Sequence, residues 1–236
     1  MTSMKFGITE SFECAYIPSN QERLLVYVGS SLHSTLEDYE TLLEAGFRRS
    51  GDQVYRPQCP LCNACQSLRV RAFSFQKSKS QKRIWNKNRD IECQISRENK
   101  PEYYELYEKY INARHSDGSM YPPTKTQYTD FLKNNWAPPL FLELRKQDKV
   151  VGVAVTDELP RSLSALYTFY DPELESRSLG SLSILHQIQQ AQKLGKQYVY
   201  LGYQINESRK MNYKNKFLPN EQYIDHRWVS FQKKCG

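Results

Sequence analysis

The sequence has no long hydrophobic run. Within its 236 residues no apolar stretch approaches the about 18 residues that a membrane-spanning helix needs. Residues 1–11 lack the apolar core of a secretory signal peptide. We therefore expect a cytoplasmic protein without a membrane partner, in which the six cysteines are reduced thiols or metal ligands rather than disulfides. Internal repeats and low-complexity segments are also missing.

Acidic residues are absent from one long segment. From Gln53 to Arg89 there is no Asp or Glu, while the same segment carries nine Lys or Arg residues, interleaved with Phe73, Phe75 and Trp85. The whole chain has a formal net charge of +7, which favours a polyanionic partner. A basic tract without acids, interleaved with aromatic residues, indicates phosphate binding and above all RNA. The alternative is an ordinary solvated basic surface.

Three cysteines stand close together inside this basic segment. Cys59, Cys62 and Cys65 have C-x2-C-x2-C spacing, and Cys14 could supply a fourth ligand. Four thiolates suit a tetrahedral zinc ion, and the same run also suits an iron–sulfur cluster. The alternative is a group of reduced thiols packed together without a metal. The spacing predicts that the cysteines cluster, and it does not select a metal.

Periodicity and turn residues predict two parts. Residues 1–75 are expected to form a small α+β domain that carries the cysteine loop, with a strand at 24–28 and a helix over 34–45 capped by Ser34. Residues 76–236 are expected to form the second domain, which opens with a basic link over residues 76–100.

The second domain has the clearer order of elements. Its predicted strands cover residues 140–145, 149–156, 163–170 and 197–202, with a helix that ends near residue 194 before the last of them. Consecutive antiparallel strands, a loop leading into a helix, and a strand that can lie parallel match the core of acyltransferases of the N-acetyltransferase (GNAT) type. The predicted fold class is therefore α+β, with a small cysteine-containing domain followed by a GNAT-like acyltransferase domain.

The start of that helix bears on the donor substrate. Acetyl-CoA enzymes of the GNAT type have a pattern close to R/Q-x-x-G-x-G/A here, because small residues let backbone N–H groups approach a pyrophosphate. This chain matches at Arg177 and Gly180 but has Leu182 in the last place. We expect Leu182 to crowd a pyrophosphate, which favours a tRNA 3′ end over CoA. The alternative is a simple helix start in which Gly180 relieves strain.

Eight short motifs follow one another along the chain. They are Cys14-Ala-Tyr-Ile-Pro18, Tyr55-Arg-Pro-Gln-Cys59, Cys62-x-x-Cys65, Arg114-His115, Asp171-Pro172, Arg177-Ser-Leu-Gly180, Tyr200-Leu-Gly-Tyr203 and Lys210-Met-x-Tyr-Lys214. In this order they resemble the arginyl-tRNA–protein transferase family, and more narrowly its bacterial aspartate/glutamate leucyltransferase branch. The resemblance extends from about Phe12 to Trp228, nearly the whole chain.

The resemblance implies a reaction and its partners. Members of that branch move leucine from leucyl-tRNA to the N-terminal Asp or Glu of a protein, which creates a degradation signal. The donor is an activated ester, so neither a covalent nucleophile nor a cofactor is required for the transfer. The partners are charged tRNA and proteins with N-terminal Asp or Glu, and DNA is not expected. A CoA-dependent N-acyltransferase and a non-catalytic, metal-stabilised RNA-binding protein remain the alternatives.

Site residues follow from these motifs and from the basic tract. The expected catalytic residues are Tyr203, Lys210 and His115. The expected substrate-binding residues are Arg177, Gly180, Tyr200, Tyr213 and Lys214. The expected tRNA-binding residues are Lys77, Lys79, Lys82, Arg83 and Arg89. The possible metal ligands are Cys14, Cys59, Cys62 and Cys65.

We expect a cation in the substrate-binding site to pair with the acceptor's carboxylate, and Arg177 and Lys210 are the candidates. The alternative for each of these assignments is a structural role. The tyrosines would lie at strand edges, the lysines would be solvated, and His115 would have no catalytic role.

Overall fold

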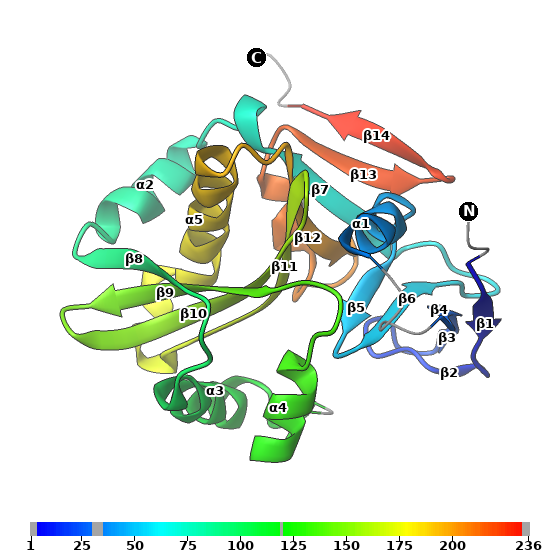
Figure 1. Ribbon diagram of the computed structural model, residues 1–236, viewed down its shortest axis with the longest axis horizontal. Coiled ribbons are helices and arrows are strands. Elements are labelled where there is room, and N and C mark those ends of the chain that lie inside the picture. Colours follow the sequence, from blue (N-terminus) through cyan, green and yellow to red (C-terminus); the bar gives the residue numbers. More distant parts are fainter. Residues whose placement is uncertain (1–3, 30–34, 119, 233–236) are drawn as a thin grey trace.

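The computed structural model describes residues 4–29, 35–118 and 120–232 (Figure 1). In these ranges the chain forms an eight-stranded sheet, a four-stranded sheet and a two-stranded ribbon, with helices packed on them. The mixed α and β class expected from the sequence is confirmed. No helix in the described ranges is long and apolar enough to cross a membrane.

The large sheet has the strand order β14-β13-β7-β12-β11-β10-β9-β8. Its strands are β7 (Gln66–Arg71), β8 (Ile91–Ser96), β9 (Pro139–Lys146), β10 (Lys149–Glu158), β11 (Ser162–Tyr170), β12 (Tyr198–Gln204), β13 (Asn220–Ile224) and β14 (Arg227–Phe231). All neighbours are antiparallel except β11 and β12, which run parallel. This confirms the predicted run of antiparallel strands followed by a parallel one.

Helices cover both faces of the large sheet because its central strands are apolar on both sides. Along β9, Leu142 packs under α5 (Leu179–Lys193), whereas the preceding Phe141 packs under α3 (Pro101–Arg114). Helix α2 (Lys79–Lys87) lies beside α5, and α4 (Lys125–Leu132) lies beside α3 (Figure 1).

A smaller sheet and helix α1 (Leu36–Glu44) lie at the other end of the molecule (Figure 1). The sheet has the order β1-β4-β6-β5. Its strands are β1 (Phe6–Ile8), β4 (Leu24–Tyr27), β5 (Arg48–Ser50) and β6 (Gln53–Pro57), and the ribbon is formed by β2 (Phe12–Glu13) and β3 (Gln21–Glu22). The expected helix cap, Ser34, lies outside the described residues. The observed capping box is formed by Thr35 and Asp38.

Strand β7 joins the two ends of the molecule. It comes directly after the cysteine loop in sequence, yet it pairs with β12 on one side and β13 on the other. The segment expected as domain 1–75 therefore contributes an inner strand to the large sheet, and the division at residue 75 stays a prediction.

The expected basic link over residues 76–100 is wrong, because this segment holds helix α2 and strand β8. Ser78 and Gln81 form a capping box at the start of α2. The partly buried Trp85 packs against the core.

Candidate active site

Strands β11 and β12 diverge in the middle of the sheet. They pair only from Ser162 opposite Tyr198 to Ser164 opposite Tyr200. Beyond that point β11 continues to Tyr170 and β12 to Gln204 without pairing with each other. We call the separated segments, residues 165–170 and 201–204, the fork. On the sides where the two segments face each other, their backbone groups have no ladder partner and need other ones.

Arg48 lies at the apex of the fork. From β5 its Nη1 donates to Ser164 Oγ at 3.3 Å and its Nη2 to the carbonyl of Ala165 at 2.5 Å. Gly202 makes this approach possible, because a Cβ there would lie 3.0 Å from Arg48 Cζ. The backbone of Gly202 has a φ of +79° beside a β-bulge, a conformation that favours glycine.

Lys214 lies next to this apex, on the 3₁₀ helix η4 (Asn212–Lys216). Its Nζ donates to the carbonyl of Tyr203 at 2.6 Å and lies 3.8 Å from Met211 Sδ. Burial, and after it the positive charge of Arg48, lower the pKa of Lys214 to about 7. The side chain is therefore partly uncharged at neutral pH.

A pH-dependent stability follows from Lys214. Its pKa is lower in the folded chain than in the unfolded chain, where a lysine titrates near about 10.4. Between about pH 7 and about pH 10 the unfolded chain therefore holds a proton that the folded chain lacks, and the free energy of unfolding rises with pH. Below about pH 7 both states are protonated and the burial penalty is fully present.

We expect Lys214→Met to flatten this rise. The measurement is urea unfolding of wild type and variant at about pH 7 and about pH 9. Lys125→Met, at an exposed position on α4, is the control and should keep the wild-type slope. An equal rise in the Lys214→Met protein would contradict the assignment.

The two predicted tyrosines of β12 are both buried. Tyr203 is 8% exposed, and its hydroxyl lies 3.1 Å from the carbonyls of Gly46 and Tyr55. Burial raises its pKa well above the ordinary value, so the hydroxyl stays protonated. Tyr200 is 1% exposed and accepts a hydrogen bond from Arg69 at 3.1 Å. Its ring offers no free face for stacking on a base.

His115 and Lys210 lie together at the wide end of the fork. His115 Nε2 is 3.4 Å from the Tyr110 hydroxyl, and burial followed by the charge of Lys210 lowers the pKa of His115. Its ring is therefore neutral near pH 7 and able to accept a proton. Lys210 is largely exposed and lies 3.5 Å from Asp117. Burial, and then Tyr170, raise the pKa of Tyr213.

The start of α5 lies beside the end of β11. A Cβ on Gly180 would lie 3.6 Å from the Tyr170 ring, so the glycine is close to the wide end of the fork. Arg177 makes a bidentate ion pair with Asp90, at 2.6 and 2.9 Å. Both terminal nitrogens of the Arg177 guanidinium are therefore already engaged by Asp90.

The expectation about Leu182 is wrong. This side chain is 1% exposed and packs with Ile91, Leu144 and Val151 in the core. It points into the sheet and does not crowd the helix start, so it gives no reason to prefer tRNA over CoA.

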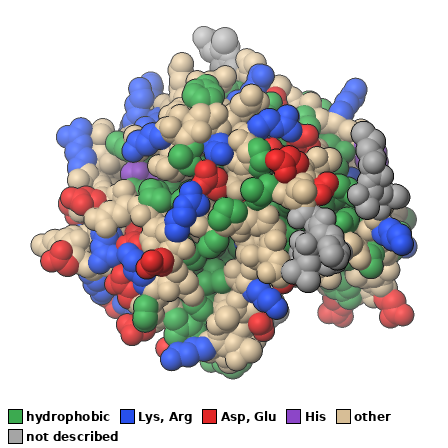
Figure 2. Space-filling view, in the orientation of Figure 1, with side chains coloured by type: hydrophobic (Ala, Val, Ile, Leu, Met, Phe, Trp, Pro, Cys, Tyr) green, Lys and Arg blue, Asp and Glu red, His purple; other side chains and the backbone are tan. Residues whose placement is uncertain are grey.

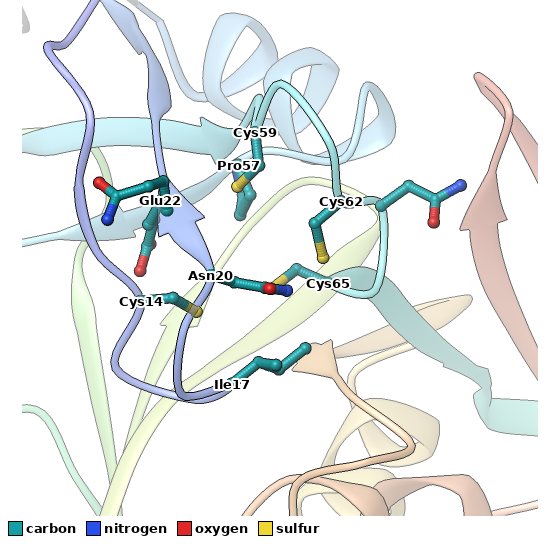
Figure 3. Close-up of a pocket in the computed structure, with 10 residues that line it drawn as sticks. Cys14, Ile17, Asn20, Glu22, Pro57, Cys59, Cys62 and Cys65 are labelled. Carbon is teal, nitrogen blue, oxygen red and sulfur yellow. The ribbon is translucent and has the colours of Figure 1, made fainter.

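The cysteines gather as predicted. Figure 3 shows the sulfur atoms of Cys14, Cys59, Cys62 and Cys65 directed into one space, a cavity of about 30 Å³. Burial, and after it the charge of Glu22, raise the pKa of Cys65 to about 12, so this thiol is protonated at neutral pH.

The thiols suit zinc or an iron–sulfur cluster in kind, but their arrangement does not fit one. In the described part of the chain no set of three or more His, Cys, Asp or Glu side chains could hold a metal ion. The metal hypothesis has no support here.

A wider cavity of about 190 Å³ adjoins the cysteine loop. It lies between this loop and the β13–β14 turn, and Arg56, Tyr203 and His226 are among its lining residues. Ser67 also lines it, and its buried hydroxyl has no hydrogen-bond partner. The cavity thus reaches Tyr203, whose carbonyl holds Lys214 in the fork.

The predicted tRNA-binding residues lie on and around α2. Lys79, Lys82 and Arg83 are exposed, and Figure 2 shows Lys and Arg side chains over the edge of the molecule where α2 lies. Lys77 lies over the Trp85 ring at 4.0 Å, which ties that lysine to the helix.

The last turn of α2 leads toward the start of α5. Lys87 Nζ donates to the carbonyl of Ser176 at 2.8 Å, and Asn88 to that of Arg177 at 3.0 Å. Beyond the helix, Arg89 is exposed and donates to Asn86 at 3.1 Å. The basic surface therefore continues toward the wide end of the fork.

Comparison with known proteins identifies the family. Residues 12–83 match the family described as "Arginine-tRNA-protein transferase, N terminus", and residues 102–224 match "Arginine-tRNA-protein transferase, C terminus". The chain belongs to the arginine-tRNA–protein transferase family. The resemblance seen in the sequence is confirmed.

Relatives within the family are similar over nearly their full length. A protein from Aeromonas hydrophila named aspartate/glutamate leucyltransferase is 53% identical over 98% of this chain and 97% of its own. One from Pseudoalteromonas atlantica with the same name is 53% identical over 98% of this chain and 99% of its own. Among solved structures FemX is 8% identical, with a TM-score of 0.48 over 92% of this chain and 85% of that chain. That likeness is too weak to carry an inference.

Sequence reasoning missed one residue of this transferase-family site, Arg48. Its only signal is the pair Arg48-Arg49 in a short strand directly after the buried Phe47. Two adjacent arginines in a strand point to opposite faces, so one of them is expected to face inward. Here both are buried, because β5 is the edge strand of the small sheet and both side chains reach the large sheet, Arg48 at β11 and Arg49 at β10.

Proposed function

We propose that this protein is an aspartate/glutamate leucyltransferase, an enzyme that moves leucine from leucyl-tRNA to the N-terminal Asp or Glu of acceptor proteins. The similarity to relatives of that name, at 53% identity over 98% of the chain, carries the proposal. The product, a protein with a new N-terminal leucine, is a degradation signal in this family.

The chemistry asks little of the protein beyond positioning. The acceptor's α-amino nitrogen attacks the ester carbonyl of leucyl-tRNA, an amide bond forms, and the bond to the ribose oxygen breaks. The amine loses a proton and the released tRNA hydroxyl gains one. Holding both reactants in place can contribute about 7–11 kcal/mol, so no cofactor is needed for the transfer.

A neutral imidazole suits the proton removal. The acceptor's amine has an ordinary pKa near about 8 and must be uncharged to attack. His115 is neutral near pH 7 because burial lowers its pKa, and it lies at the wide end of the fork with Tyr110. We assign it the role of proton acceptor in this proposal.

The arrangement also supports a path for the tRNA. Strands β11 and β12 run parallel and then part, and we place the reacting ends of both substrates where they separate. The exposed cations of α2 would hold the acceptor stem, and the 3′ end would reach Gly180 and Tyr213 at the wide end of the fork. The cytoplasm, where charged tRNA is available, is the proposed compartment.

The test is transfer of labelled leucine from charged tRNA to a peptide that begins with Asp. The transferase is expected to label this peptide much faster than one that begins with Asn. A non-catalytic RNA-binding protein would shift tRNA on a gel and label neither peptide. A CoA-dependent acyltransferase would acylate the peptide from an acyl-CoA donor and not from tRNA.

A further inference from the structure

Arg48 differs from the other buried arginines. Within the described residues three arginines are less than one tenth exposed, namely Arg48, Arg49 and Arg69. Arg49 is paired with Asp157 and Arg69 with Glu221. Arg48 bonds only to a hydroxyl and a carbonyl. A buried charge is costly unless it is paired, so an unpaired one marks a place where a counter-charge is missing.

The second cation beside it is also unpaired. Lys214 is 9% exposed and is held by a backbone carbonyl and a sulfur atom. In the described part of the chain neither Arg48 nor Lys214 has a carboxylate within ion-pair distance. The two positive charges repel each other, and an anion bound between them would relieve this repulsion.

The hydrogen-bonding capacity of both groups is only partly used. A guanidinium has five N–H donors and an ammonium has three. Arg48 uses its Nη1 and Nη2 atoms toward β11, and Lys214 makes one short bond to Tyr203. Donors remain on both side chains for an incoming oxygen pair.

We propose that Arg48 and Lys214 form the pocket that binds the side-chain carboxylate of the acceptor's N-terminal Asp or Glu. This inference rests on the proposed function. The first residue of a chain can present its carboxylate to two buried cations from one side, whereas a phosphate within a nucleic acid is continuous with the chain on both sides. The nearly dry surroundings would discriminate Asp from Asn, because an amide leaves both cations without a counter-charge.

The two cations expected from the sequence suit this role less well. The guanidinium of Arg177 is already held by Asp90. Lys210 is 67% exposed beside Asp117, where water screens its charge. An exposed ammonium distinguishes a carboxylate from an amide only weakly.

The experiment compares kcat/KM for peptides that begin with Asp and with Asn, in wild type, Arg48→Met and Lys214→Met. Each variant is expected to lower the Asp/Asn ratio about 10- to 100-fold. KM for leucyl-tRNA should stay near the wild-type value. Arg97→Gln and Lys125→Met, at exposed positions, are the matched controls and should keep the ratio.

A measurement on the wild-type protein tests the same pocket without relying on the folding of a variant. With ¹³C-labelled lysine, the Lys214 side-chain signal reports its protonation. Saturation with a peptide that begins with Asp should favour the protonated form about tenfold or more, and the Asn peptide should not.

The outcomes separate the two proposals. A wild-type protein that transfers leucine, combined with variants that keep its Asp/Asn ratio or a Lys214 signal equal for both peptides, overturns the carboxylate pocket alone. Variants that instead raise KM for leucyl-tRNA show a donor site and overturn it as well. A wild-type protein that transfers no leucine overturns the function and this inference together.

Discussion

Replacing Asp157 by leucine is expected to lower the free energy of unfolding by about 3–5 kcal/mol. Asp157 is 0% exposed and accepts two hydrogen bonds of 2.6 Å from Arg49. It also accepts one from Tyr39 at 2.9 Å and one from Asn134 at 3.0 Å. Its removal leaves a buried guanidinium that keeps the Gly51 carbonyl but has no counter-charge, and it leaves one donor each on Tyr39 and Asn134 unpaired.

Urea unfolding followed by circular dichroism measures this effect. Exchanging both partners, as Arg49→Met with Asp157→Leu, should cost less than the sum of the single changes, because no unpaired charge remains. Arg114→Gln, which breaks the exposed pair with Glu175, is the control and should cost about 1 kcal/mol or less. A single Asp157→Leu effect no larger than that of the control would show that the pair is not buried in solution.

Reversing two charges on α2, Lys82→Glu with Arg83→Glu, is expected to raise KM for leucyl-tRNA about tenfold or more. Both side chains are exposed on the acid-free helix, and each cation that binds a phosphate releases counterions from the tRNA. The log–log dependence of kcat/KM on salt should flatten by about 0.7–0.9 for each phosphate that the variant no longer binds.

The matched control is a double reversal at the two ends of α4, Lys125→Glu at its first residue with Lys133→Glu at the residue that follows it. Helix α4 lies with α3, on the opposite face of the large sheet from α2. This variant should keep the wild-type salt slope, and the α2 variant should remain as stable as wild type to urea. An unchanged slope in the α2 variant would identify its cations as an ordinary solvated surface.

The sequence predicted the strands and the helix of residues 139–204 well, because their pattern is local. Strand β10 is rich in valine, and α5 has apolar residues on one face, so each element is visible within its own segment. Helix α2 was missed for the opposite reason. It carries only Ile84 and Trp85 as apolar side chains, and its charge suggested a solvated link.

Strand β13 was missed because its buried residues are polar, and its partner β14 was missed because none of its residues is buried. Asn220 and Gln222 are at most 6% exposed, and their amide groups bond to loop and strand partners, apart from the buried Oδ1 of Asn220, which has no partner. Nothing local in a sequence distinguishes such a buried amide from a surface one.

The candidate site was predictable only where motifs carried it. Tyr203, Lys214 and Gly180 came from the family resemblance, and the structure places all three along the fork. Arg48 could not be found that way, since its position depends on contacts with Ser164 and Ala165, more than 100 residues away along the chain. Such long-range pairing is decided by the fold and not by the neighbouring sequence.

The position of β7 has an evolutionary consequence. Deleting an inner strand leaves two sheet edges with unpaired backbone N–H and C=O groups, which promote aggregation. A gene rearrangement that exchanged the N-terminal segment for an unrelated one would remove this strand and Arg48 with it. The two family segments, residues 12–83 and 102–224, must therefore be inherited together, and a substitution in one is selected against the background of the other.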